Sequence, residues 1–336
     1  MNFLSTLFFV LISISATLGQ HVNGLTIVGT PSKFDVNPYP RIAQTEANWV
    51  CFVPYGFTRL EETSIHFNLE KQWWGEKKAG IIENIKLAKD QGMKIFLKPQ
   101  IYIPGSWPGA LDFTEEDWKT WESNYREFIE FYIDIAEQYE VDMFCIGTEF
   151  KISEQKRAFF WKSLIQEIRC DYSGLLTYSS NWDSYEKVGF WDDLDFIGIS
   201  SYFPICTKSN PKNKDFDKAW KSKILDLEKY SKEKNRKILF TEYGYLSVEG
   251  CAGKTWELEK QVHQLEVNQE AQAKAFDALF RNLWDRNFWA GGFIWKWFPN
   301  DQGHEGYISK DYTPKDKLAE QVLKFWFSKD KMDVDG

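Results

Sequence analysis

The 336-residue sequence predicts an α/β fold, a single (β/α)8 barrel of the TIM type. Eight short and nearly continuously apolar runs recur along the chain, as expected for strands that are buried on both faces. Longer segments of helical period separate these runs, which is typical of parallel βα units. The sequence has no glycine-rich phosphate loop of the dinucleotide or P-loop kind, which disfavours an open nucleotide-binding sheet.

The chain begins with an apolar run, Met1–Ile12, that is too short to span a membrane comfortably and is followed by small residues up to Gly19. We expect residues 1–19 to be a cleaved signal peptide and residues 20–336 to form the barrel. The protein is then expected to be secreted or periplasmic. The run lacks the usual preceding Lys or Arg, which leaves an uncleaved anchor as the alternative.

The apolar runs give the strands directly. In chain order, the expected strands are Leu25–Gly29, Trp49–Val53, Lys94–Lys98, Val141–Gly147, Leu175–Ser179, Phe196–Ser200, Ile238–Thr241 and Gly292–Trp297. The expected helices contain the segments Ile81–Ala88, Tyr125–Tyr139, Phe160–Ile168, Trp220–Tyr230, Phe276–Trp284 and Leu318–Phe325. The first and fifth units are the weakest, because Pro38 and Pro40 shorten one helix and residues 181–188 leave room for only a turn or two. The charged tail from about residue 329 is expected to fray.

The composition limits the class of partner. A formal net charge of −8 argues against nucleic acid and anionic membranes, which require clustered Lys and Arg. Aromatic residues make up 17% of the chain, and its 16 tryptophans fit stacking surfaces for sugar faces as well as they fit an aromatic-rich core. A neutral substrate therefore fits this chain better than a polyanion.

Five scattered cysteines are too few to hold the fold together by disulfides. Cys51 and Cys145 fall in strand-like runs and are expected to be buried thiols. Cys206 and Cys251 fall in loops at one rim of the barrel, where a disulfide between them is a hypothesis. The four histidines are far apart and show no metal-ligand spacing, so neither a metal nor another cofactor is expected.

Two glutamates interrupt apolar strands at the end where barrel enzymes place their active sites. Glu149 follows the fourth expected strand and Glu242 follows the seventh, so the two face each other across the mouth of a closed barrel. Two carboxyl groups in one cleft are what glycosidic cleavage requires, one as a protonated acid and the other ionised. The structural alternative is that one or both glutamates pair with a basic residue at the rim.

The sequence around these strand ends resembles glycoside hydrolase family 113. The motifs are Ile146-Gly147-Thr148-Glu149-Phe150, Ile199-Ser200-Ser201-Tyr202-Phe203-Pro204, Phe240-Thr241-Glu242-Tyr243-Gly244-Tyr245 and Gly292-Phe293-Ile294-Trp295-Lys296-Trp297. The resemblance covers nearly the whole chain after the signal. It implies a retaining barrel enzyme whose activity is mainly that of an endo-β-1,4-mannanase, acting on mannan or glucomannan by double displacement.

By position, the resemblance makes Glu149 the proton donor and later the base, and Glu242 the nucleophile. It makes Tyr202 a hydrogen-bond donor to the nucleophile, and the alternative is an ordinary buried tyrosine. Thr148 stands where the wider clan usually has an asparagine that can hold the sugar 2-hydroxyl. Its hydroxyl could do part of that work.

Other candidates lie on the same predicted rim. Trp295 and Trp297 belong to the eighth strand, and strict alternation points both the same way, as a sugar-stacking floor. Arg59 could steady the charge of the nucleophile or form a salt bridge at the rim. Further subsite candidates, each with a plainer structural alternative, are Lys98, Gln100, Asn181, Trp182, Trp107, Trp73 and Trp74.

Three alternatives to an endo-acting mannanase stay open. An exo-acting β-mannosidase or another β-glycanase would use the same two carboxyl groups with differently shaped loops. A non-catalytic β-glycan-binding barrel would not need both glutamates. A Schiff-base enzyme acting through Lys98 would explain neither glutamate. In each case we expect a saccharide partner, no nucleic acid, no membrane after removal of the signal, and a monomer.

Overall fold

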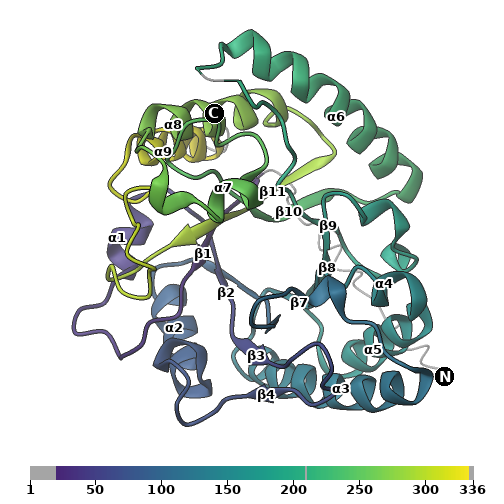
Figure 1. Ribbon diagram of the computed structural model, residues 1–336. Helices are drawn as coiled ribbons and strands as arrows, with labels where there is room; N and C mark the ends of the chain where they lie inside the picture. Colours follow the sequence, from purple (N-terminus) through teal and green to yellow (C-terminus); the bar gives the residue numbers. More distant parts are fainter. Residues whose placement is uncertain (1–19, 209, 333–336) are drawn as a thin grey trace, which may run out of the picture.

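The computed structural model describes residues 20–208 and 210–332, and its centre is a closed barrel of eight parallel strands. Around the ring, the strands are β1 (Val22–Ile27), β2 (Trp49–Phe52), β5 (Lys94–Leu97), β7 (Met143–Thr148), β8 (Leu175–Asn181), β9 (Ile197–Ser200), β10 (Ile238–Tyr243) and β11 (Trp289–Trp297). Figure 1 looks along this barrel and shows most of the helices arranged around it. The predicted barrel is confirmed, and each expected strand overlaps an observed one.

The helices follow the strands in the expected βα order. They are α1 (Tyr39–Ala43), α2 (Lys78–Lys89), α3 (Glu115–Gln138), α4 (Ser153–Lys156), α5 (Ala158–Asp171), α6 (Asn213–Lys234), α7 (Thr255–Glu259), α8 (Gln269–Leu283) and α9 (Leu318–Met332), with short 3-10 turns η1 (Trp74–Glu76), η2 (Pro108–Ala110), η3 (Tyr185–Lys187), η4 (Trp191–Asp193) and η5 (Val262–Gln264). The two units that the sequence marked as weak are short. Helix α1 has five residues, and only η3 and η4 lie between β8 and β9.

The last helix continues beyond the position at which the sequence predicted fraying. Helix α9 runs to Met332, and Asp330 within it is buried. The Asp330 carboxylate accepts hydrogen bonds from the His21 backbone N–H at 3.0 Å and from the Asn23 side chain at 2.8 Å. These bonds tie the end of α9 to the start of β1, and residues 333–336 of the expected tail lie outside the described residues.

A small second sheet that the sequence analysis did not anticipate extends one side of the barrel. Its order is β4 (His66–Phe67), β3 (Tyr55–Phe57) and β6 (Gln100–Tyr102). Strand β3 follows β2 after Pro54, and β6 follows β5 after Pro99. Proline cannot donate a ladder hydrogen bond, so each barrel strand stops there and pairing resumes beyond it. The side chains of β3 and β6 consequently reach the carboxyl-end mouth.

The tryptophans serve both purposes that the composition left open. Ten of the sixteen are buried and belong to the core. The remaining six, Trp73, Trp74, Trp107, Trp182, Trp256 and Trp295, all lie in connections or strand ends at the carboxyl side of the barrel. The aromatic excess is thus partly core and partly rim.

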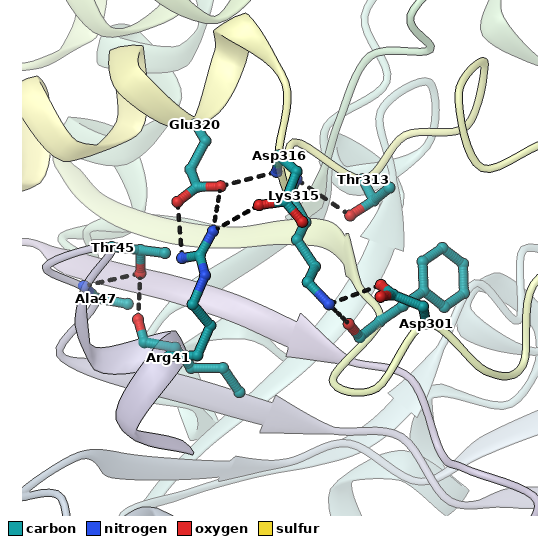
Figure 2. Close-up of polar contacts among 10 residues, drawn as sticks. Arg41, Thr45, Ala47, Asp301, Thr313, Lys315, Asp316 and Glu320 are labelled. Atoms are coloured by element: carbon teal, nitrogen blue, oxygen red, sulfur yellow. Dashed lines mark hydrogen bonds and ion pairs between the residues drawn. The ribbon is translucent and has the colours of Figure 1, made fainter. Parts of the chain in front are cut away.

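A cluster of ion pairs holds the connection between β11 and α9 against α1, as Figure 2 shows. Arg41 donates to Glu320 at 2.8 Å and to Asp316 at 2.9 Å. Lys315 donates to Asp301 at 2.6 Å and to the Phe298 carbonyl at 3.2 Å. The long connection that leaves β11 at the mouth is therefore fixed at both ends.

All five cysteines are free thiols, so the hypothesis of a Cys206–Cys251 disulfide is not supported. The two loops are joined instead by the backbone, because the N–H groups of Ile205 and Cys206 both bind the Ala252 carbonyl, at 2.8 and 2.9 Å. Cys51 and Cys145 are buried as expected. Within the described residues, no helix is long and apolar enough to cross a membrane, and the expected signal peptide lies outside them.

Candidate active site

Glu149 stands immediately after β7, at the carboxyl-end mouth of the barrel. Its backbone is left-handed, with a φ of 58°, which turns the chain sharply away from the strand direction. Its own N–H donates to the Ser179 carbonyl at 2.7 Å, so the turn stays anchored to the neighbouring β8. The half-buried side chain lines the largest cavity at the mouth.

Glu242 lies within β10 and is held by two partners that approach different carboxylate oxygens. The Lys98 ammonium, which follows β5, lies 2.7 Å from Oε2, and the Tyr202 hydroxyl donates to Oε1 at 2.6 Å. Lys98 is fully buried, and burial by itself lowers its pKa. The negative charge and hydrogen bond of Glu242, together with the neighbouring Cys51 and Cys145, outweigh burial, so the pKa of Lys98 is raised. The geometry is that of a charge-assisted pair.

Glu149 differs from Glu242 in its electrostatic surroundings. Burial, and after it the negative charge of Glu242, raise the pKa of Glu149 from 4.5 to about 7. The Ser200 hydroxyl opposes part of this rise by hydrogen bonding to the carboxyl group. One carboxyl group at the mouth thus keeps its proton to near-neutral pH, and the other is held by a cation.

The two glutamates open into a cavity of about 920 Å³ that is rich in aromatic side chains. Trp182 and Trp256 stack on each other in its wall, with ring centroids 5.8 Å apart and an interplanar angle of 19°. A second cavity of about 590 Å³ shares Tyr102, Glu259 and Trp295 with the first. The two adjoining cavities form one extended, aromatic-lined cleft, which is a surface suited to a saccharide chain.

The sequence profile of glycoside hydrolase family 113 matches residues 37–317 of the chain. The chain belongs to this family. A solved complex of a family 113 β-1,4-mannanase is 26% identical, with a TM-score of 0.78 over 92% of this chain and 99% of that one. A family 113 β-mannanase from Alicyclobacillus acidocaldarius, solved with ManMIm, is 25% identical, with a TM-score of 0.79 over 93% of this chain and 98% of that one.

More distant structures share the fold alone. A β-glucuronidase from Faecalibacterium prausnitzii is 14% identical, with a TM-score of 0.61 over 92% of this chain and 49% of that one. Comparison with curated protein sequences gives no match.

Six of the twelve further candidates predicted for this family 113 chain reach the cleft. Asn181, Trp182, Trp107, Tyr202 and Trp295 line the first cavity together with the two glutamates. Trp73 lines the second cavity. Lys98 lies behind Glu242 instead of in the cavity wall, so its contact is with the carboxylate and not with open space.

Trp297 and Arg59 lie elsewhere, so both placements are corrected. Trp297 is fully buried, with the Arg41 guanidinium 5.4 Å from its ring centroid. Leu25 and Ile27 of β1 pair with Ile294 and Trp297 of β11, so a step of two positions along β1 matches a step of three along β11. This bulge breaks the alternation that put both tryptophans on one face. Arg59 is 76% exposed and pairs with Glu62 at 4.0 Å, which makes it a surface ion pair.

Three further candidates do not line either cavity. Gln100 pairs with Tyr55 in the outer sheet, because β6 belongs to that sheet and not to the barrel. Thr148 is buried, with its hydroxyl 3.9 Å from the Cys145 thiol. Trp74 packs edge-on against Phe34 with ring centroids 5.4 Å apart.

Sequence reasoning missed several cleft residues. Tyr102, Trp256, Glu259 and Tyr312 line the first cavity. Trp256 lies in the short helix α7, in the connection between β10 and α8. The signal that could have identified it is a single tryptophan within an otherwise charged segment. Glu154 was also missed. Its carboxyl group lies close enough to Glu149 to raise the pKa of that residue further.

Proposed function

We propose that this chain is a retaining endo-β-1,4-mannanase that hydrolyses mannan or glucomannan by double displacement. One observation carries the proposal. Glu149 and Glu242 line the same cavity, the pKa of Glu149 is raised to about 7, and Glu242 is paired with the Lys98 ammonium. An acid with a raised pKa beside a carboxylate held by a cation is the pair of groups that a retaining glycosidase uses.

In the first step, the Glu242 carboxylate attacks the anomeric carbon while Glu149 gives its proton to the glycosidic oxygen. The bond between that carbon and the glycosidic oxygen breaks, and a glycosyl ester forms on Glu242. Tyr202 and Lys98 hold one oxygen of Glu242 each, which fixes the direction in which the carboxylate approaches the sugar.

In the second step, Glu149 is ionised and acts as a base. It takes a proton from a water molecule whose oxygen attacks the anomeric carbon and displaces Glu242. Each step inverts the configuration at that carbon, so the product retains the configuration of the substrate. Both enzyme carboxyl groups return to their starting protonation states.

The choice of substrate and of an endo mode rests on the family and on the cleft. The two family 113 structures compared above are a β-1,4-mannanase and a β-mannanase. Aromatic side chains line both adjoining cavities, which leaves binding surface beyond the immediate surroundings of the two glutamates. A cleft that continues past the cleaved bond suits an internal site in a polysaccharide.

The test is product formation from β-1,4-mannan, glucomannan and cellulose, followed by reducing-sugar release, oligosaccharide analysis and the initial anomer by NMR. We expect mixed oligosaccharides of retained configuration from the mannans. Glu149→Gln and Glu242→Gln should each lower kcat/KM on mannan by about 10³-fold or more. Glu320→Gln, which changes a buried glutamate in the Arg41 cluster, is the matched control and should keep activity.

Release of mannose alone would identify an exo-acting enzyme. Binding of mannan without any cleavage would overturn the proposal in favour of a glycan-binding barrel.

A further inference from the structure

Glu154 is a fully buried carboxyl group five residues beyond Glu149. It belongs to α4, and hydroxyl groups from β8 and the following turn surround it. Tyr178 donates to Oε2 at 3.0 Å, Ser180 donates to the same oxygen at 3.1 Å, and Ser184 also hydrogen-bonds to the carboxyl group. No Lys or Arg of the described residues lies within ion-pair distance of it, which is unusual for a group with no solvent exposure.

The Tyr178 hydroxyl connects Glu154 to the backbone beside Glu149. The Phe150 N–H donates to the Tyr178 oxygen at 2.9 Å, and Tyr178 donates its own proton to Glu154. A hydroxyl group has a single proton, so committing that proton to Glu154 turns the oxygen lone pair toward Phe150. The Glu154 N–H also donates to the Phe150 carbonyl at 2.8 Å, which closes the loop.

These contacts bracket the strained backbone of Glu149. A residue other than glycine with a φ of 58° costs about 1 kcal/mol or more and persists only where its surroundings fix it. The N–H of Glu149 is held by the Ser179 carbonyl, and the next N–H along the chain, that of Phe150, is held by Tyr178. Both peptide groups on either side of the Glu149 Cα are thus tied to β8.

We propose that Glu154 is a positioning residue that acts through Tyr178 to hold the acid/base Glu149 in its reactive orientation. This inference rests on the proposed function, because it assigns a role relative to the general acid. Glu154 itself does not line the cavity and so does not contact substrate. Its effect should appear only in steps that need a proton from Glu149.

The test compares two leaving groups. Cleavage of a β-1,4-mannooligosaccharide needs protonation of the departing oxygen, whereas 2,4-dinitrophenolate leaves a β-mannobioside without it. We expect Tyr178→Phe and Glu154→Gln to lower kcat/KM for the oligosaccharide by about tenfold or more, and for the dinitrophenyl substrate by less than about threefold. A general loss of structure would lower both values alike.

Tyr172→Phe is the matched control. It removes another buried tyrosine hydroxyl, which donates to the Val141 carbonyl at 2.7 Å, at the opposite end of β7 from Glu149. Tyr172→Phe should leave kcat/KM for both substrates unchanged. Melting temperatures of all three variants show whether each is folded.

A second readout separates positioning from a packing role. Burial raises the pKa of Glu154 as well, to about 7, so its negative charge acts on Glu149 mainly above that pH. Glu154→Gln removes this charge and should move the alkaline limb of kcat/KM to lower pH. The other charged groups acting on Glu154 and Glu149, Lys151, Lys98 and Glu242, are unchanged in this variant.

Equal losses on both substrates, or no loss on either, would overturn the inference while leaving the proposed function intact. A wild-type protein that cleaves neither substrate would instead refute the proposed function. If Tyr178→Phe does not fold, Glu154→Gln decides the matter, because the amide replaces one carboxylate oxygen by an NH2 donor and no longer fixes the direction of the Tyr178 proton.

Discussion

The carboxyl end of strand β11 contains two tryptophans, Trp295 and Trp297, two positions apart. A basic side chain lies near each indole ring, and each of these basic side chains is paired with a glutamate. The Lys98 ammonium lies 6.0 Å from the Trp295 ring centroid and binds Glu242 at 2.7 Å. The Arg41 guanidinium lies 5.4 Å from the Trp297 ring centroid and binds Glu320 at 2.8 Å. The same three kinds of side chain are thus assembled on the two sides of one strand.

The two assemblies differ in whether a cavity reaches the tryptophan and the carboxylate. Trp295 is half-buried and lines both cavities, and Glu242 lines the larger one. Trp297 is fully buried, and one oxygen of Glu320 also accepts the Asp316 backbone N–H (Figure 2). A tryptophan, a cation and a carboxylate therefore make a candidate reactive centre only where a cavity reaches the carboxylate. Where the cavity is missing, the same groups fasten helices to the barrel.

The largest expected contrast comes from removing the two cations. Lys98→Met should lower kcat/KM on mannan by about 10²- to 10³-fold, because Glu242 loses the charge that holds it as a nucleophile. Arg41→Met should leave kcat/KM within about twofold and lower the free energy of unfolding by about 2 kcal/mol, because Glu320 stays buried without its partner.

Steady-state kinetics and chemical denaturation of both variants measure this contrast. If Arg41→Met is folded but loses as much activity as Lys98→Met, the distinction between a functional and a structural ion pair is wrong.

The two tryptophans give the next contrast. Trp295→Ala should raise KM for mannooligosaccharides by about tenfold or more, because a sugar face loses its stacking partner. Trp297→Ala should lower the free energy of unfolding by about 3 kcal/mol, because it leaves a large cavity in a closed core. Denaturant titration and KM measured on the same preparations separate the two effects, and a reversed pattern would contradict the placement of the side chains.

The smallest effect is a pH dependence. The pKa of Glu149 is raised to about 7, so kcat/KM should fall with rising pH above that value, by about tenfold per pH unit, as the acid loses its proton. The folded protein also binds this proton more tightly than the unfolded chain does. The resulting stabilisation is complete below about pH 4.5 and is lost as the pH rises through about 7.

Glu149→Gln should therefore be more stable than the wild type at pH 8, by on the order of 1 kcal/mol, and should lose that advantage near pH 5. Thermal melts at both pH values test this. An equal difference at the two pH values would mean that the carboxyl group does not titrate with a raised pKa.

The sequence identified the two candidate catalytic glutamates because the rule involved is local. A charged residue that directly ends a buried strand has to emerge at the carboxyl end of the barrel, and this placed Glu149 and Glu242 together without knowledge of any long-range contact. The eight strands were predictable for a similar reason, since burial on both faces leaves a continuous apolar run. The outer sheet was not, because β3, β4 and β6 have only two or three residues each.

By itself, then, the sequence determined the barrel and the position of two glutamates at the carboxyl ends of its strands. The tertiary structure decided which neighbours those groups have. A bulge between β1 and β11 sent Trp297 into the core, and the packing of the barrel brought Lys98, not Arg59, to Glu242. The positions of the strands in the sequence follow from local burial. The direction of a side chain depends on strand register and on segments far away in the chain.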